Sequence, residues 1–168
     1  MTKSFDFSDM EFFTVGTLGP RGERAFFLQG RASGKLVSLK VEKQQVSALA
    51  DYLDQVLEDL PEIEQEPFVT EAADLDLREP VISAFTVGGL GVAYSSDEDR
   101  LVVMAEELLE TDEPDELEAA RARFLLRRDQ VAHWIERARE IVSAGRPPCP
   151  FCGTPLQPRN GDWCSCSN

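Results

Sequence analysis

Four cysteines near the end of the chain have the types and spacing that most clearly predict chemistry. The first two belong to the motif Cys149-Pro150-Phe151-Cys152-Gly153. In such a turn both thiolates face one ion, because proline stiffens its start and glycine accepts a positive φ after the second ligand. A second pair is expected some ten to twenty residues later, and it arrives as Cys164-Ser165-Cys166. Four thiolates fill a tetrahedral site with no open position, so the sequence predicts structural zinc on Cys149, Cys152, Cys164 and Cys166.

Metal binding is also what we expect to fold this end of the chain. Residues 146–168 contain only three large apolar side chains, Phe151, Leu156 and Trp163, which is too few to offset the entropy of ordering them. Free thiols, a disulfide and iron in place of zinc remain alternatives. If one cysteine is not used, Asp162 could supply an oxygen ligand.

No second constellation of side chains indicates catalysis. His133 is the only histidine, and no motif places a nucleophile beside it. Residues 16–22 and 88–91 are glycine-rich, but neither run precedes a helix or contains the Gly-Lys-Ser/Thr of a phosphate loop, so both are interpreted as hairpin turns. We therefore nominate no catalytic and no cofactor-binding residue, and we favour a protein that is not an enzyme.

Composition and charge narrow the class of protein. The chain has 168 residues, of which 42% are hydrophobic and 29% charged, with a formal net charge of −14. This charge favours solubility and repels phosphate backbones, so nucleic acid is an unfavourable partner. No apolar run is long enough for a membrane-spanning helix, and the N-terminus lacks the apolar region of a signal peptide. We expect a cytoplasmic protein.

Ahead of the cysteines, the sequence predicts two successive sets of strands, each followed by a helix. Strands are predicted at 11–16, 24–29 and 35–41, and an apolar stripe of helical period predicts a helix over about 43–60. An acidic connector follows over 58–80, with nine acidic residues and Arg78 as its only basic one. Further strands are predicted at 81–87, 90–94, 100–104 and 120–126, and a helix at 129–144 with Asp129 as its N-cap.

The two helices repeat one apolar pattern. Positions 85 residues apart are apolar in both, as in Val46 and Val131 or Leu49 and Trp134. Upstream, the four residues from Phe13 recur from Phe85. The sequence therefore predicts an α+β fold of two related strand-strand-strand-helix halves, about 10–60 and 81–145, with a mostly antiparallel sheet. One α+β domain without duplication is the alternative. The predicted domains are 1–145 and a small zinc ribbon over 146–168.

Arginine is concentrated in the last third of the chain. Residues 121–168 hold eight arginines and four acidic residues. Such an end could contact RNA or DNA, or it could dock on the acidic loops of the same protein, which we favour.

Three stretches together resemble a known family. They are Arg21 to Gln29, Val41 to Val46, and Ala144 to Gly153. They are similar to a mainly actinobacterial family, the domain of unknown function number 3090, along nearly the whole chain. Members typically end in a cysteine pair followed by Gly-His-x-Cys, which implies a Cys₃His metal site. Here Asp162 stands at the histidine position, and we infer that Cys166 replaces the lost ligand.

Three functions follow as hypotheses. The first is a non-enzymatic protein-interaction or regulatory module whose zinc ribbon organises a docking surface for another protein. The second is an enzyme or small-molecule binder with a site between the two halves, where Arg24, Glu42, Lys43 and Gln44 could supply polar contacts. The third is RNA or DNA binding through the arginine-rich end.

Overall fold

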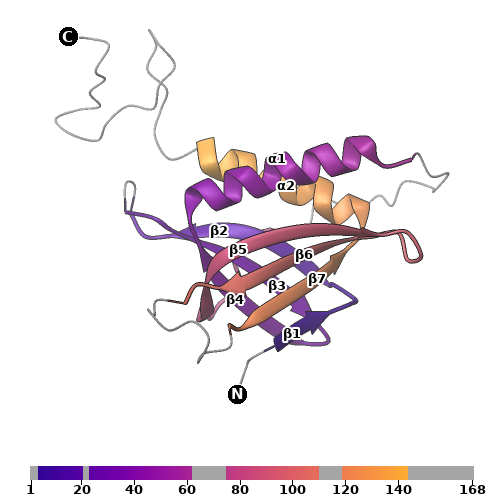
Figure 1. Cartoon of the computed structure of the whole chain (residues 1–168). Helices are drawn as coiled ribbons and strands as arrows, with labels where there is room; N and C mark the ends of the chain where they lie inside the picture. Colours follow the sequence, from indigo (N-terminus) through magenta and orange to yellow (C-terminus); the bar gives the residue numbers. More distant parts are fainter. Residues whose placement is uncertain (1–3, 21–22, 62–74, 110–118, 144–168) are drawn as a thin grey trace, which may run out of the picture.

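The part of the chain that the structure describes forms one seven-stranded sheet and two helices (Figure 1). The computed structural model describes residues 4–20, 23–61, 75–109 and 119–143. The elements are β1 (Ser4–Phe7), β2 (Phe12–Leu18), β3 (Ala25–Ala32), β4 (Lys35–Val41), α1 (Lys43–Asp59), β5 (Ser83–Ser95), β6 (Arg100–Glu107), β7 (Arg121–Leu126) and α2 (Arg128–Ser143).

The predicted α+β class and mostly antiparallel sheet are confirmed. The strand order is β1-β7-β6-β5-β4-β3-β2, and only the β1–β7 and β4–β5 pairs are parallel. Three antiparallel strands followed by a helix occur twice, as β2-β3-β4-α1 and as β5-β6-β7-α2. The predicted helix stripes are buried, with Val46 and Val131 at corresponding positions.

The sheet must curl, because its two edge strands are neighbours in sequence. β1 and β2 lie at opposite edges, six strand spacings or about 28 Å apart in a flat sheet. Residues 8–11, which join them, span at most about 18 Å. The curl brings the rings of Phe13 on β2 and Phe124 on β7 within 5.1 Å of each other across the concave face.

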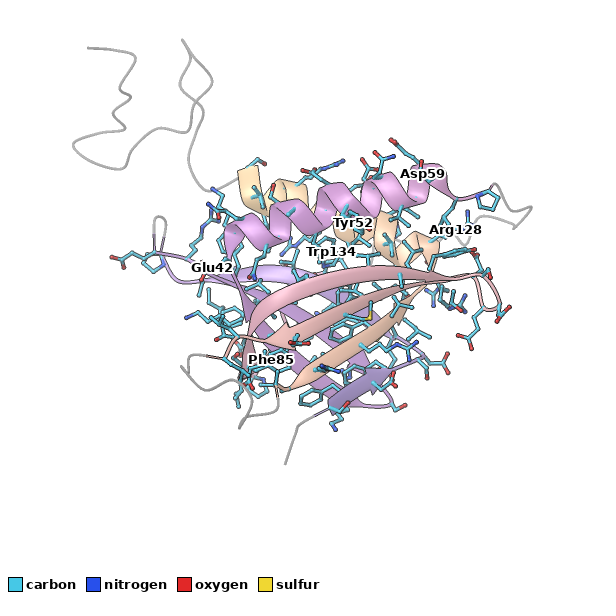
Figure 2. All side chains as sticks on the ribbon, viewed as in Figure 1. Glu42, Tyr52, Asp59, Phe85, Arg128 and Trp134 are labelled. Atoms are coloured by element: carbon cyan, nitrogen blue, oxygen red, sulfur yellow. The ribbon has the colours of Figure 1, made fainter. Side chains whose placement is uncertain are left out.

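The helices complete the core on this concave face. α1 and α2 pack side by side, and α2 also packs on β2 (Figure 1). Trp134 is fully buried between helix and sheet, with its ring 5.9 Å from that of Phe13 (Figure 2). In α1 the side chain of Gln45 accepts a hydrogen bond from the backbone N–H of Glu42, which closes the first turn.

Several predicted boundaries were wrong. Residues 88–91 are not a hairpin turn: they continue β5, which is one strand through a bulge at Gly88 where two strands were expected. β1 was not predicted at all. α2 begins at Arg128, so Asp129 lies in its first turn, where it pairs with Arg127, and is not the N-cap. Gly19, with a φ of 103°, does form part of the predicted turn between β2 and β3.

Part of the predicted solvated connector is instead packed against the sheet. We call residues 75–79 the strap, and it lies on the convex face of β2 and β3. Gln29, which is fully buried, accepts a hydrogen bond from the Arg78 N–H at 2.6 Å and donates to the Arg78 carbonyl at 2.8 Å. Thr14 donates to the carbonyl of Leu75. The strap therefore covers the convex face of the first half over Thr14, Gly16 and Gln29.

Candidate functional site

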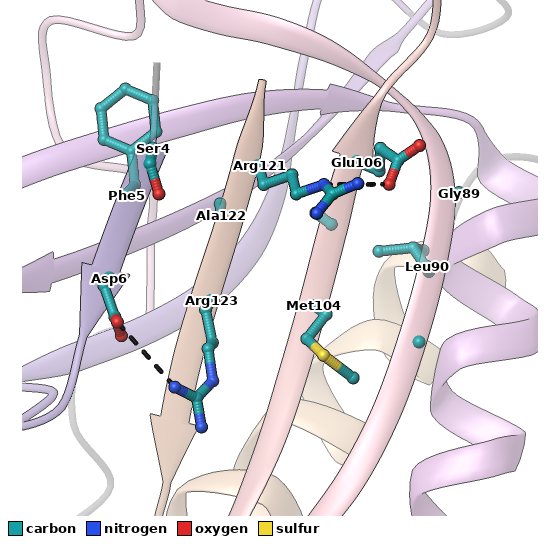
Figure 3. A pocket seen from close by; sticks show the side chains of 12 residues that line it. Ser4, Phe5, Asp6, Gly89, Leu90, Met104, Glu106, Arg121, Ala122 and Arg123 are labelled. Atoms are coloured by element: carbon teal, nitrogen blue, oxygen red, sulfur yellow. Dashed lines mark ion pairs between the residues drawn. The ribbon is translucent and has the colours of Figure 1, made fainter. Parts of the chain in front are cut away.

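The convex face of the second half carries a shallow cavity of about 650 Å³ over β1, β7, β6 and β5 (Figure 3). We call it the outer trough. The strand register places its side chains in two rows across the sheet. One row contains Ser4, Arg121, Glu106 and Gly89, and the next contains Asp6, Arg123, Met104 and Gly91.

Glycine and methionine form the apolar floor of the outer trough. A Cβ on Gly89 would meet no atom within 4 Å, and one on Gly91 would meet only the Met104 Cε at 3.5 Å. Met104 is 39% exposed, which is unusual for a large apolar side chain in this sheet. The floor is therefore open to a side chain from outside.

Two ion pairs border this floor. Arg121 Nε lies 3.2 Å from Glu106 Oε2, and Arg123 Nη1 lies 3.9 Å from Asp6 Oδ2 (Figure 3). All four side chains are more than half exposed. Exposed pairs of this kind contribute about 0–1 kcal/mol, so an incoming carboxylate could replace either acidic partner at little cost.

A second cavity, of about 520 Å³, lies between α1 and β5. We call it the α1–β5 cleft. Its position between the halves is where a small-molecule site was hypothesised, but its lining differs from the prediction. Neither cavity is lined by the residues that the sequence nominated, Arg24, Glu42, Lys43 and Gln44.

A third cluster joins the β5–β6 hairpin to the start of α2. Tyr94 donates a hydrogen bond of 2.6 Å to Asp99 Oδ1, and Arg128 Nε lies 3.0 Å from the same oxygen. Burial by itself would raise the pKa of Asp99, but the hydrogen bonds from Tyr94 and Arg128 outweigh burial and lower it. Arg128 also donates to the carbonyl of Pro61 beyond α1, so the cluster ties the two halves together.

The described arginines of the last third form ion pairs within the protein. The six that the structure describes each pair with a carboxylate: Arg121, Arg123, Arg127, Arg128, Arg137 and Arg139. Arg137 and Arg139 pair with Asp76 of the strap and with Asp51 and Asp54 of α1. These pairs reduce the positive charge available to a phosphate backbone.

The predicted metal ligands lie outside the described residues. Cys149, Cys152, Cys164 and Cys166, with Asp162, all fall in 144–168. Among residues 4–20, 23–61, 75–109 and 119–143, no group of three or more histidine, cysteine or acidic side chains is arranged to hold a metal. His133 is half-buried on α2.

Sequence reasoning missed the outer trough and the lining of the α1–β5 cleft, although a signal for both was present. Glycines 88, 89 and 91 remove side chains from both faces of β5 where the cavities lie. Glycine within a strand can mark a bulge or a close approach by another group as well as a turn. Because these glycines lie inside a 13-residue strand, they mark a bulge and open space beside the strand, and they do not form a turn.

No helix in the described ranges combines the length and the apolar character needed to cross a membrane.

Comparisons with known proteins identify the family of this chain and nothing finer. Neither the curated proteins nor the solved structures include a match to this chain. The model of one family, described as a protein of unknown function (DUF3090), matches residues 5–164. The resemblance seen in the sequence is thus confirmed, and the chain belongs to the DUF3090 family.

Proposed function

We propose that this protein is a non-enzymatic binding module that docks an extended segment of another protein in the outer trough. One observation carries the proposal: the strap covers the convex face of the first half over β2 and β3, whereas the same face of the second half is open over Gly89, Gly91 and Met104.

The strap indicates what such a face accepts. Its Leu77 lies directly over Gly16 of β2, where any Cβ would collide with the leucine side chain. Its backbone bonds to polar side chains of the sheet, since Gln29 pairs with both the N–H and the carbonyl of Arg78. Asp76 beside Leu77 pairs with Arg137 at 3.1 Å. The strap thus places a leucine over a glycine of the sheet, and the carboxylate next to that leucine pairs with an arginine.

The outer trough offers the same chemistry to a partner. Gly89 and Gly91 leave room for an aliphatic side chain, which would pack against Met104. Arg121 and Arg123 stand beside that room with exposed guanidinium groups, which bind carboxylates in bidentate geometry. The partner segment is therefore extended, with a leucine-like residue next to one or two acidic residues.

Selection from a displayed library of random heptapeptides tests this proposal. The full chain is the target, and each round includes counter-selection against Gly89→Trp. That substitution fills the trough from a position with open space around its Cβ, so it leaves the core intact. We expect the enriched peptides to combine an aliphatic residue with acidic neighbours, and we expect Arg123→Ala to weaken their binding.

The matched control is Glu136→Trp, which places an indole on an exposed position of α2, away from the trough. Peptide binding should survive it. Enrichment that is equal on wild type and Gly89→Trp, or no enrichment at all, would overturn the proposal. Enrichment of basic peptides would contradict the assigned partner chemistry.

The zinc ribbon is a further part of this proposal. The Cys-Pro-Phe-Cys-Gly turn and the Cys-Ser-Cys pair support one structural zinc on Cys149, Cys152, Cys164 and Cys166, in a cytoplasmic protein. In this proposal the metal folds a small appended surface and takes no part in a reaction, because four protein ligands leave no position for water or substrate.

A further inference from the structure

The α1–β5 cleft has apolar walls on both sides and its own opening. α1 contributes Gln45, Ala48, Leu49 and Tyr52, which lie on one face of the helix, and β5 contributes Gly88, Leu90, Gly91 and Val92. Tyr52 is 56% exposed, although a large aromatic side chain on a packed helix is usually covered. The cleft volume of about 520 Å³ is in the range of small-molecule sites.

The corresponding interface between α2 and β2 is filled. There α2 packs on β2, and the ring of Trp134 stacks on Phe13 with an interplanar angle of 26°. Helix positions correspond at an offset of 85, so Leu49 occupies the place of Trp134 and Ala48 the place of His133. Both replacements are to smaller side chains. On its helix side, the α1–β5 cleft is therefore lined by Leu49 and Ala48 at the positions where α2 carries a buried indole ring and a half-buried imidazole ring.

We propose that the α1–β5 cleft binds a small ligand through a bicyclic aromatic ring of about indole size. The ring would lie between Leu49 of α1 and Leu90 and Val92 of β5, and the exposed ring of Tyr52 would pack against it in the offset or edge-on geometry that aromatic pairs prefer. This inference uses the inner side of β5 and does not depend on the proposed peptide site on the outer side.

One end of the cleft is fixed by hydrogen bonds. Gln45 accepts from the Glu42 N–H at 2.8 Å and donates to the Val87 carbonyl at 3.1 Å. These bonds tie the first turn of α1 to β5 just before the bulge, so the end wall is held in place without a ligand. A preformed apolar site of this kind binds without a large cost of ordering.

A titration with indole itself tests the inference. Two-dimensional ¹H–¹⁵N NMR spectra of the full chain should show shifts that saturate at millimolar indole, confined to residues 45–52 and 88–92. Ala48→Trp places a covalent indole at the mouth of the cleft from an exposed position, so it should fold normally and abolish these shifts. Leu49→Trp tests the same point from the buried position that Trp134 occupies in the other half.

The matched control is Ala132→Trp, on the exposed face of α2, which should leave the indole titration unchanged. The inference is overturned if indole causes no saturable shifts, or if the shifts persist in Ala48→Trp. Shifts that map to residues 4–6 and 121–123 would instead place the ring in the outer trough, and would also overturn it.

Discussion

Trp134 is the largest of the fully buried side chains, and it connects the helix layer to the sheet. Its ring packs on Phe13, which in turn packs on Phe124 across the curled sheet. Replacing it by alanine should lower the free energy of unfolding by about 3–5 kcal/mol, through lost burial and the cavity left behind. Urea unfolding followed by circular dichroism measures this change.

A second variant at this position separates burial from hydrogen bonding. The indole Nε1–H of Trp134 is buried and has no hydrogen-bond partner among the described residues. Trp134→Phe keeps a ring on Phe13 and removes this N–H, so it should cost clearly less than Trp134→Ala. Equal costs for the two variants would contradict the packing of this ring on Phe13.

Asp99 makes the stability of the protein depend on pH in acid. Its pKa in the folded protein lies below the ordinary value of 3.8, because the hydrogen bonds from Tyr94 and Arg128 outweigh burial, which alone would raise it. A carboxyl with a lowered folded pKa stabilises the protein above 3.8, and this contribution disappears as the pH falls through the folded pKa.

Comparison with Asp99→Asn measures this contribution. Asparagine still accepts the hydrogen bond from Tyr94 but cannot form the ion pair with Arg128. The variant should be less stable than wild type near neutral pH, and the difference in free energy of unfolding should shrink as the pH falls below 3.8. A difference that stays constant between pH 7 and pH 3 would contradict this role of the carboxylate.

At the scale of elements, local periodicity was sufficient for the helices. Their predicted ranges, 43–60 and 129–144, match Lys43–Asp59 and Arg128–Ser143 to within one residue at each end. The apolar stripes determine these helices because each buries one face on its neighbours. The zinc ligands, by contrast, stay a prediction, since they lie outside the described residues.

Elements that depend on distant contacts could not be predicted. β1 has four residues and is a strand because it pairs in parallel with β7, more than 100 residues away. The strap was predicted to be solvated because its two leucines lie among acidic residues, which dominate the local composition. The hydrogen bonds between Gln29 and Arg78 have no local sequence signal, because the two residues are far apart in the chain. Gly88–Gly91 resembled a turn because a bulged strand and a hairpin both favour glycine.

A double-mutant cycle tests how the strap packs. Gly16→Ala introduces a Cβ into the side chain of Leu77, which should lower the free energy of unfolding by about 1–3 kcal/mol. Leu77→Ala removes the colliding atoms, so the same glycine substitution should cost much less in that background. Urea unfolding of the four proteins gives the coupling. Independent effects of the two substitutions would mean that the strap does not lie on Gly16.

At the scale of the whole molecule, the two halves depend on each other. α2 of the second half is bonded to the chain that follows α1: Arg137 pairs with Asp76 of the strap, and Arg128 donates to the carbonyl of Pro61. The second half supplies β5, to which Gln45 of α1 is bonded. We therefore expect residues 4–143 to unfold in one transition, with the cysteine-containing end as a separate unit.

Zinc removal tests this division. In the proposed site, the protein purified without added metal should carry close to one zinc ion per chain, and Cys149→Ser or Cys152→Ser should release it, because the Cys-Pro-Phe-Cys-Gly sequence predicts a turn that faces both thiolates to one ion. A chelator should then expose the chain near Pro147 to proteolysis while the helical circular-dichroism signal stays, since Val131, Trp134 and Leu53 keep the core closed without metal.

Two further variants test the fourth ligand. Asp162→Ala should retain the ion, and Cys166→Ser should weaken its binding. The reverse result would make Asp162 the fourth ligand, and a metal-free protein with four titratable thiols would remove the site.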